Sequence, residues 1–157
     1  GHAATGQPGS WHNGGAAVSA LLQRQLGAKA QAVVIADGSG MSRDNRVTPR
    51  AIVAVLSAMA RDRRLAPIYR ESLSIAGRDG TLEKRFDTGL SGQVYGKTGY
   101  IAGVSTLSGY VVDATGQQTV AFSLLFNDVR DLQAVRKLQE QLVRHSDESI
   151  APVGAGR

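Results

Sequence analysis

The sequence predicts an α+β fold in which helices flank a three-strand antiparallel meander. Apolar residues recur at helical spacing up to residue 62 and again after residue 131. Between residues 92 and 127 the pattern changes to an alternation with period two, which is typical of strands. The links between these alternating runs are short, which favours antiparallel pairing. At 157 residues the chain is long enough for one domain with a sizeable core and too short to expect two.

The first segments are expected to be a loop and a helix. Residues 1–14 are rich in Gly, His and Asn, and they are expected to form a leader loop. Its first two residues, Gly1 and His2, resemble the remnant of a cleaved tag. The run AAVSALLQRQLG (16–27) carries apolar residues at helical spacing and closes on Gly27, a residue typical of a helix C-cap.

A strand, a polar loop and two helices are expected next. QAVVIAD (31–37) is a β-branched run that predicts a buried strand. Thr48 before Pro49 is typical of a helix N-cap followed by proline in the first turn, and it introduces the helix AIVAVLSAMARD. LAPIYRESL predicts a further short helix. The loop DGSGMSRDNRVTP holds polar residues that are expected to bond their own backbone and to have no catalytic role: Asp37, Ser39, Ser42 and Asn45.

The C-terminal half is expected to supply the sheet and the helix that covers it. The strands are QVYGKTGY, VSTLSGYVVD and QTVAFSLLFND, after a turn at GRDGT. The helix DLQAVRKLQEQLVRH should pack on this sheet, with Asp131 at the end of the helix dipole that favours negative charge. Residues 147–157 are expected to form a flexible tail. The apolar stripe of the helix is predicted to be Leu132, Val135, Leu138 and Leu142.

Composition excludes several classes of site. The net charge of +5 comes from scattered arginines with only eight aromatic residues, which indicates a solvated basic surface and leaves nucleic-acid binding a weak alternative. The absence of cysteine excludes disulfides and thiol catalysis, and three separated histidines suggest no metal centre. No cofactor is expected. No run reaches the length of a membrane span, and no signal peptide opens the sequence.

The triplet Lys97-Thr98-Gly99 between two predicted strands is the main candidate for a functional motif. A phosphate-binding loop needs glycine at position 91, where this chain has Ser91, and it needs a helix directly after the triplet. In penicillin-recognising enzymes, by contrast, Lys-Thr-Gly lies on a strand that borders the active site. The lysine and the hydroxyl suit a substrate carboxylate, and the glycine lets substrate approach the backbone.

Four segments, taken together, resemble the D-alanyl-D-alanine carboxypeptidase/endopeptidase family, the class C low-molecular-mass penicillin-binding proteins. In order along the chain they are DGSGMSRDNRVTP, SLSIAGRDGTLEKRF, GQVYGKTG and GVSTLSGYV, within residues 5–127. The resemblance implies a periplasmic or otherwise extracytoplasmic hydrolase that acts on peptidoglycan stem peptides through an acyl-enzyme. It implies the fold of a penicillin-binding, serine β-lactamase-like domain, with residues 15–146 as its C-terminal portion.

The resemblance also implies roles for individual residues. Lys97 would act electrostatically in the catalytic centre, and the amide of Tyr100 would form half of the oxyanion hole. Thr98 and Gly99 would bind substrate, with the Thr98 hydroxyl on the carboxylate of a peptide or a β-lactam. Tyr100 departs from the usual Thr or Ser, so a hydroxyl contact at short reach is lost there.

Two motifs of this family are absent from the chain. No serine is followed by lysine three positions later, and no Ser-x-Asn occurs. In the family both motifs precede the matched region, so the chain is expected to be a C-terminal fragment that is inactive alone. Its expected partners are the N-terminal remainder of the same enzyme and peptidoglycan peptide or β-lactam, with self-association as another way to cover apolar surface. A non-catalytic module that binds peptidoglycan peptide or β-lactam remains the alternative.

Overall fold

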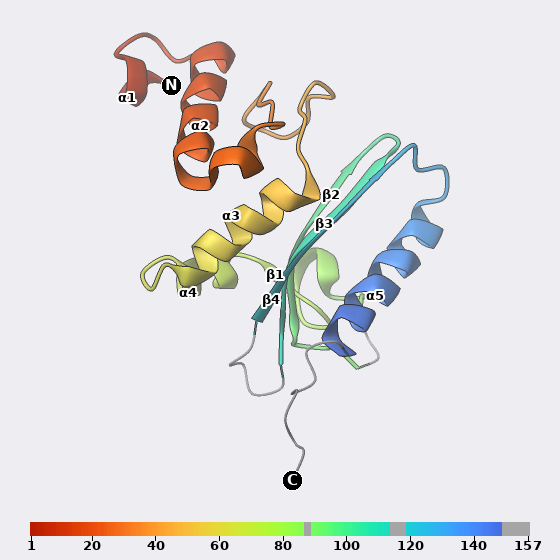
Figure 1. Cartoon of the computed structure of the whole chain (residues 1–157). Helices are drawn as coiled ribbons and strands as arrows, with labels where there is room; N and C mark the ends of the chain where they lie inside the picture. The colour runs from red at the N-terminus through yellow and green to blue at the C-terminus, as the bar shows by residue number, and fades with distance from the viewer. Residues whose placement is uncertain (87–88, 114–118, 149–157) are drawn as a thin grey trace. The chain divides into compact units, whose positions relative to one another are not determined.

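The computed structural model describes residues 1–86, 89–113 and 119–148 (Figure 1). It confirms the α+β class, with helices and a four-stranded antiparallel sheet. The α-helices (α), 3₁₀ helices (η) and strands (β) follow one another as α1 (His2–Thr5), α2 (Trp11–Leu26), η1 (Gly27–Ala30), α3 (Pro49–Arg61), α4 (Ala66–Glu71), β1 (Ser74–Ile75), η2 (Gly80–Leu82), β2 (Val94–Ile101), β3 (Val104–Val112), β4 (Thr119–Asn127) and α5 (Leu132–Glu148).

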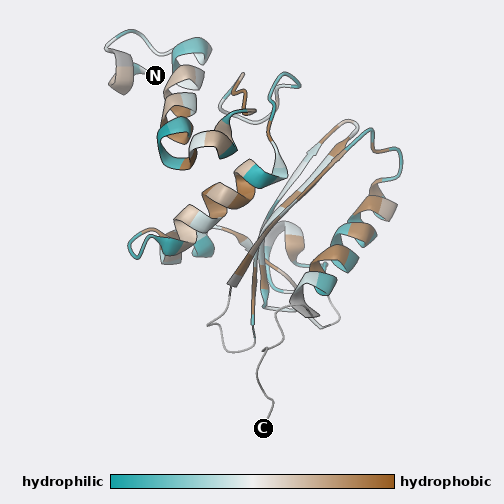
Figure 2. Cartoon of the chain, viewed as in Figure 1, coloured by the Kyte–Doolittle hydropathy of each residue, from teal (hydrophilic) through white to brown (hydrophobic). Residues whose placement is uncertain are grey.

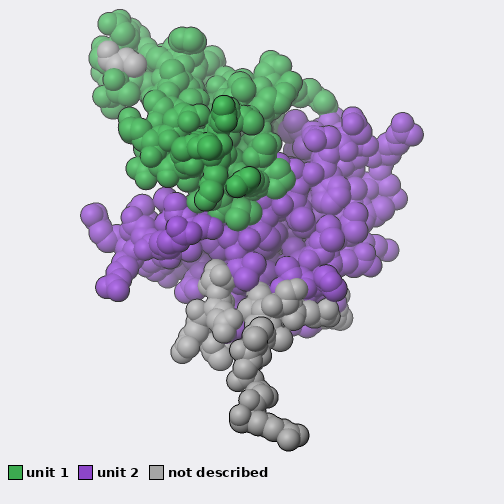
Figure 3. Space-filling model, in the orientation of Figure 1, with its two compact units in different colours: residues 1–55 green, residues 56–157 purple. Residues whose placement is uncertain are grey.

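The chain divides into two compact units, residues 1–55 and 56–157, which Figure 3 colours separately. The length had suggested a single domain. The number of domains stays a prediction. The described residues buried in the first unit are all small: Gly15, Ala30 and Ala51. The large buried apolar side chains belong to the second unit, where most of them form one cluster around Leu82, Phe86 and Leu107.

Helix α2 begins earlier than the sequence indicated. Ser10 caps it: the Ser10 hydroxyl accepts a hydrogen bond from the Asn13 amide at 3.1 Å, and the Asn13 side chain accepts one from the Ser10 amide at 2.8 Å. This reciprocal pair starts the helix at Trp11, and a short helix also covers His2–Thr5, so the expected loop over 1–14 is wrong in these parts. Gly27 ends α2 with a positive φ of 55°, as predicted.

The buried strand predicted over 31–37 is wrong. Only Val34 bridges another segment, at Arg46, and its side chain is 51% exposed. The described part of the first unit offers no further strand to extend this pairing. Asn45 holds the segment instead, because its side-chain oxygen accepts a hydrogen bond from the Ala36 amide at 2.8 Å.

The loop after residue 36 is organised around the carboxylate of Asp37. Backbone amides donate to it from Gly40 at 3.0 Å and from Ser42 at 3.0 Å. The Asn45 side chain donates at 2.6 Å and the Ser39 hydroxyl at 2.7 Å. These bonds, that from Asn45 foremost, favour the charged carboxylate and hold the pKa of Asp37 well below its usual range. The loop therefore bonds its own backbone, as the sequence indicated.

Replacing Asp37 by asparagine is expected to loosen this loop. Native-state hydrogen exchange should accelerate several-fold at the Gly40 and Ser42 amides, because a neutral amide oxygen is a weaker acceptor than a carboxylate. The depressed pKa means that the carboxylate stabilises the fold above its unfolded pKa of about 3.8, and that this stabilisation is lost as the pH falls below that value. Asp44→Asn, an exposed carboxylate in the same loop, is the control; equal exchange in both variants would contradict this account.

The three-strand meander predicted from the sequence is confirmed. Strands β2, β3 and β4 pair antiparallel in that order, and Lys97 lies opposite Ser108. A fourth strand, β1, pairs with β2 through Ser74 and Ile75 only. Two residues are too few to show an alternating pattern, so β1 could not be predicted from the sequence.

Helix α5 packs on β3 and β4, as predicted, and its buried stripe agrees with the predicted one only in part. Val143 and Gln139 are each 1% exposed, whereas Leu138 is 41% and Leu142 44% exposed. Leu132 and Val135 are partly buried, whereas from the middle of the helix the buried line lies one residue after the predicted Leu138 and Leu142. Gln139 enters the core because its amide finds partners there. Figure 2 shows the hydrophobic residues along α5 and the strands.

Helix α4 covers the opposite face of the sheet, so that α4 and α5 lie on different sides of it (Figure 1). The rings of Tyr69 and Tyr110 meet edge to face, with centroids 6.4 Å apart, and the Arg70 guanidinium lies 5.5 Å from the Tyr95 ring centroid. The Tyr110 hydroxyl donates to the Leu56 carbonyl at 2.7 Å. Burial, together with the nearby Tyr69, raises the pKa of Tyr110 to about 12.

Helix α5 continues to Glu148, so the first two residues of the tail predicted over 147–157 are helical; residues 149–157 lie outside the described residues. Asp131 caps the helix by accepting hydrogen bonds from the Gln133 and Ala134 amides at 2.9 and 3.0 Å. Among the helices described, none combines the length and the hydrophobicity that a bilayer crossing requires.

Candidate functional site

The Lys-Thr-Gly triplet lies on β2, next to an open edge of the sheet. Strand β1 pairs only with Tyr95 and Gly96, so from Lys97 onward the outer edge of β2 has no strand partner among the described residues. On the inner side the triplet pairs with β3 over its whole length. An open strand edge of this kind can pair with an extended peptide.

The hydrogen-bonding direction along β2 places the Tyr100 amide at this open edge. The Val112 amide donates to the Gln93 carbonyl at 2.9 Å, so the backbone carbonyl of Gln93 is directed toward β3. The next residue bonds outward, since the Val94 carbonyl accepts from the Ala76 amide at 2.9 Å. Because this direction alternates along an antiparallel strand, the Tyr100 amide also points outward. The backbone thus has the orientation that an oxyanion donor at residue 100 requires.

The side chains of the motif lie on two different faces of the sheet. A Cβ added to Gly96 would meet methyl groups of Leu82 and Leu107, which belong to the core on the α5 side. Side chains alternate along a strand, so Thr98 and Tyr100 also face the α5 side. Lys97 lies with Tyr95 on the face that α4 covers.

Lys97 itself is exposed, and its ammonium donates to the backbone carbonyl of Thr98 at 2.6 Å. It lines none of three cavities that the described residues form. Helix α4 contacts the sheet at Tyr95, where Arg70 lies against the ring, and it leaves the Lys97 side chain exposed. The catalytic role of Lys97 stays a prediction.

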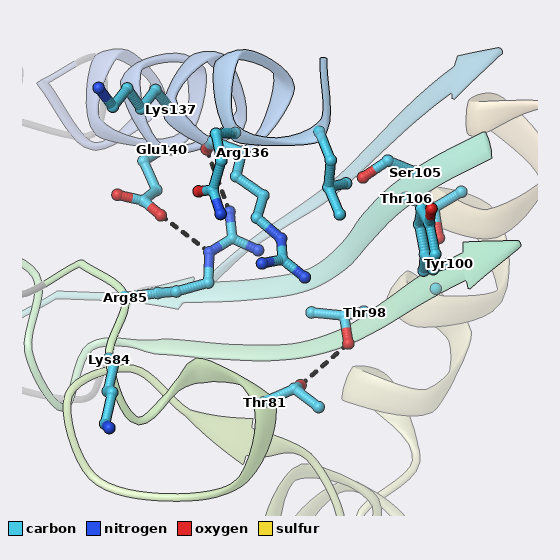
Figure 4. A pocket seen from close by; sticks show the side chains of 13 residues that line it. Thr81, Lys84, Arg85, Thr98, Tyr100, Ser105, Thr106, Arg136, Lys137 and Glu140 are labelled. Carbon is cyan, nitrogen blue, oxygen red and sulfur yellow. Dashed lines mark hydrogen bonds and ion pairs between the residues drawn. The ribbon is translucent and has the colours of Figure 1, made fainter. Parts of the chain in front are cut away.

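Thr98, Gly99 and Tyr100 instead border a cavity of about 410 Å³ on the α5 side (Figure 4). Its walls are the segment around η2, the strands β2 and β3, and the first turns of α5. The Thr98 hydroxyl donates to the Thr81 hydroxyl oxygen at 2.9 Å. The complete lining is Thr81, Lys84, Arg85, Thr98, Gly99, Tyr100, Ser105, Thr106, Leu132, Gln133, Arg136, Lys137 and Glu140.

A polar network joins three of these walls. Arg85 forms an ion pair with Glu140 at 2.8 Å and donates to the Gln139 side-chain oxygen at 3.1 Å. Gln139 in turn donates to the Ser105 hydroxyl at 3.3 Å, and Arg85 also reaches the Arg136 carbonyl at 3.1 Å. Phe86, fully buried next to Arg85, anchors this segment in the core. These hydrogen bonds connect the segment after η2 and strand β3 to helix α5 along one side of the cavity.

The charge of the lining is strongly positive. It contains the cations Lys84, Arg85, Arg136 and Lys137 and a single carboxylate, Glu140, which Arg85 engages. In Figure 4 the guanidinium of Arg136 points into the cavity toward β2, whereas the amine of Lys137 points away from it. The cavity therefore suits an anionic group.

Most of this cavity could not be predicted from the sequence. Thr98, Gly99 and Tyr100 were candidates, but Arg85 and Arg136 appeared only among scattered basic residues. They lie about fifty residues apart in the chain, and only the packing of α5 brings them together. As for metals, no group of three potential ligands among His, Asp and Glu occurs in the described part of the chain.

Comparison with known proteins points to one family. A family model described as the D-Ala-D-Ala carboxypeptidase 3 (S13) family matches residues 1–149. The D-alanyl-D-alanine carboxypeptidase DacB of Haemophilus influenzae is 36% identical over 124 residues, which cover 77% of this chain and 25% of that protein. The D-alanyl-D-alanine carboxypeptidase of Actinomadura sp. (strain R39) is 38% identical over 129 residues, 78% of this chain and 23% of that protein. The chain thus spans about a quarter of these curated relatives.

Solved structures agree with this comparison. The crystal structure of penicillin binding protein 4 (dacB) from Haemophilus influenzae superposes with a TM-score of 0.79 and 30% identity, covering 92% of this chain and 34% of that one. A penicillin G-acylated predatory endopeptidase from Bdellovibrio bacteriovorus superposes with a TM-score of 0.65 at 20% identity, which supports the fold alone.

Proposed function

This chain belongs to the D-Ala-D-Ala carboxypeptidase 3 (S13) family, and we propose that it is the C-terminal part of a serine-type D-Ala-D-Ala carboxypeptidase/endopeptidase. Such an enzyme would act on peptidoglycan stem peptides outside the cytoplasm, through an acyl-enzyme. The observation that carries the proposal is the placement of Lys-Thr-Gly on β2, where the backbone of Tyr100 is directed to an open strand edge.

Each residue of the motif has a proposed task along that edge. An extended peptide would pair with the outer edge of β2, and Gly99 would let it approach closely. The Tyr100 amide would donate to the oxygen of the acyl carbonyl as negative charge develops on it. Thr98 would hydrogen-bond the substrate carboxylate. Lys97 would supply positive charge to the reactive centre from the other face of the sheet.

The chemistry needs a nucleophile and a base that this chain lacks. Its sequence contains neither Ser-x-x-Lys nor Ser-x-Asn. Acyl transfer requires a hydroxyl activated by a neighbouring base, so the N-terminal remainder of the enzyme is proposed to supply both. By itself the chain would bind but not turn over substrate. The alternative function, a binding module without catalysis, keeps the Thr98 and Tyr100 contacts and forms no covalent product.

Labelling with a fluorescent penicillin separates these two functions. The longer polypeptide that contains this segment should form a covalent adduct that survives denaturing electrophoresis, and it should release D-alanine from a peptide ending in D-Ala-D-Ala. The 157-residue chain alone should do neither. A longer polypeptide that binds penicillin reversibly but never acylates would favour the binding module, and adduct formation by the isolated chain would contradict the proposed source of the nucleophile.

A further inference from the structure

The substrate carboxylate needs a cationic partner, and the structure offers two candidates on opposite sides of the sheet. Lys97 shares the triplet with Thr98, yet the two side chains point to different faces because they are adjacent on a strand. The hydroxyl of Thr98 instead faces the cavity under α5, to which Arg136 contributes its guanidinium (Figure 4).

We propose that Arg136 recognises, together with Thr98, the terminal carboxylate of a D-alanyl peptide. This inference rests on the proposed function and identifies a specificity-determining residue within the same site. Arg136 would also replace the hydroxyl contact that is lost where Tyr100 stands in place of the usual Thr or Ser.

The hydrogen bonds of the cavity make Arg136 available for this task. Arg85 is engaged by Glu140 and Gln139, so its charge is already compensated by the protein. Glu140 is the only carboxylate in the lining, and it pairs with Arg85. No other lining carboxylate can therefore neutralise the charge of Arg136. The Arg136 carbonyl accepts from Arg85 at 3.1 Å, and this bond fixes the backbone from which the guanidinium extends.

The hydroxyl pair at the other side of the cavity completes the site. The Thr98 hydroxyl donates to the Thr81 hydroxyl oxygen at 2.9 Å, and the Thr81 hydroxyl also lies 3.5 Å from the Ser74 hydroxyl, at the limit of a hydrogen bond. Because hydroxyl groups rotate, the Thr81 hydroxyl can instead donate to Thr98, and the Thr98 O–H then donates to a bound anion. A planar guanidinium opposite two hydroxyls matches a carboxylate, which can accept two parallel N–H bonds and further O–H bonds.

The cavity has room for more than a carboxylate. Its volume of about 410 Å³ lies within the range of small-ligand sites. Tyr100, 60% exposed, and Leu132 add apolar surface beside the polar groups. A short peptide end with small side chains fits this combination, because it presents an anionic terminus followed by methyl groups.

An NMR titration of the ¹⁵N-labelled 157-residue chain tests the proposal. The probes are N-acetyl-D-Ala-D-Ala, its C-terminal amide, and inorganic phosphate. We expect the acid to shift the amides of Thr98, Gly99 and Tyr100 and the amide to bind far more weakly. Arg136→Gln should weaken binding of the acid by about tenfold, the usual scale for one charge-assisted contact. Arg136→Lys should recover only part of this loss, since lysine keeps the charge but cannot donate two parallel N–H bonds to a carboxylate.

Arg130→Gln is the matched control, because Arg130 is exposed, lies just before α5 and carries the same charge change outside the cavity lining. It should leave the affinity for the acid unchanged. The role of Arg136 would be overturned if the parent and Arg136→Gln bound the acid with equal affinity, or if Arg130→Gln lost as much affinity as Arg136→Gln. Covalent labelling of the longer enzyme could still succeed in either case, so the two proposals are tested separately. Phosphate that binds as tightly as the acid, with the same dependence on Arg136, would overturn the assignment to a peptide carboxylate.

Discussion

Gly109→Ala is expected to destabilise the sheet by about 3 kcal/mol, the upper end of the range for overpacking. Gly109 lies on β3 opposite Gly96. A Cβ added to Gly109 would overlap the Tyr95 carbonyl oxygen and approach the Gly96 Cα to 2.7 Å. Both are backbone atoms, so the strands themselves would have to separate. Urea unfolding followed by circular dichroism measures this change in the free energy of unfolding.

The cross-strand neighbour supplies the control. A Cβ added to Gly96 would meet the ends of two flexible side chains, Leu82 at 3.1 Å and Leu107 at 3.2 Å. These methyl groups can move by a few tenths of an ångström, so Gly96→Ala should change the free energy of unfolding by less than about 1 kcal/mol. Equal losses in the two variants would show that the close approach of β2 and β3 does not limit the stability of the sheet.

Lys97→Gln, introduced into the longer polypeptide, is expected to slow acylation by penicillin by about a hundredfold, the scale for removing one preorganised group that stabilises developing charge. The expected cause is the loss of the ammonium beside the nucleophile. The folded state should be unaffected, because Lys97 is exposed and bonds only to the Thr98 carbonyl among the contacts the structure describes. Stopped-flow labelling gives the second-order rate constant directly.

Lys137→Gln is the matched control for charge, since this lysine extends from α5 on the opposite side of the sheet and its amine points away from the cavity (Figure 4). It should acylate at the parental rate. If the Lys97→Gln enzyme acylates within about threefold of the parental rate, Lys97 has no catalytic role in acylation.

The sequence predicted the helices and strands whose pattern can be seen over a few consecutive residues. The meander was visible because its strands alternate over eight or nine residues, and α3 was visible because Thr48 precedes Pro49. The Thr48 hydroxyl indeed accepts from the Ala51 amide at 3.1 Å. The run 31–37 has the composition of a strand, but composition cannot supply a partner strand, and the segment makes one bridge only.

The candidate site was predictable only in part, for the same physical reason. Strand periodicity placed Lys97 and Thr98 correctly on β2, yet the two side chains diverge because neighbours on a strand face opposite ways. The cavity depends on contacts across more than fifty residues, between Arg85 and Glu140. Gln139 was invisible as a core residue because a polar side chain is buried only when distant partners satisfy it.

The most direct test of the account is a crystal structure of the longer polypeptide acylated by penicillin. We expect the acyl group at the outer edge of β2, with its carbonyl oxygen about 2.7–3.1 Å from the Tyr100 amide nitrogen, and the Lys97 ammonium turned toward the acylated serine. An acyl group bound elsewhere in the protein, with the Tyr100 amide making no contact to it, would contradict the assignment of β2 as the strand that borders the reactive centre.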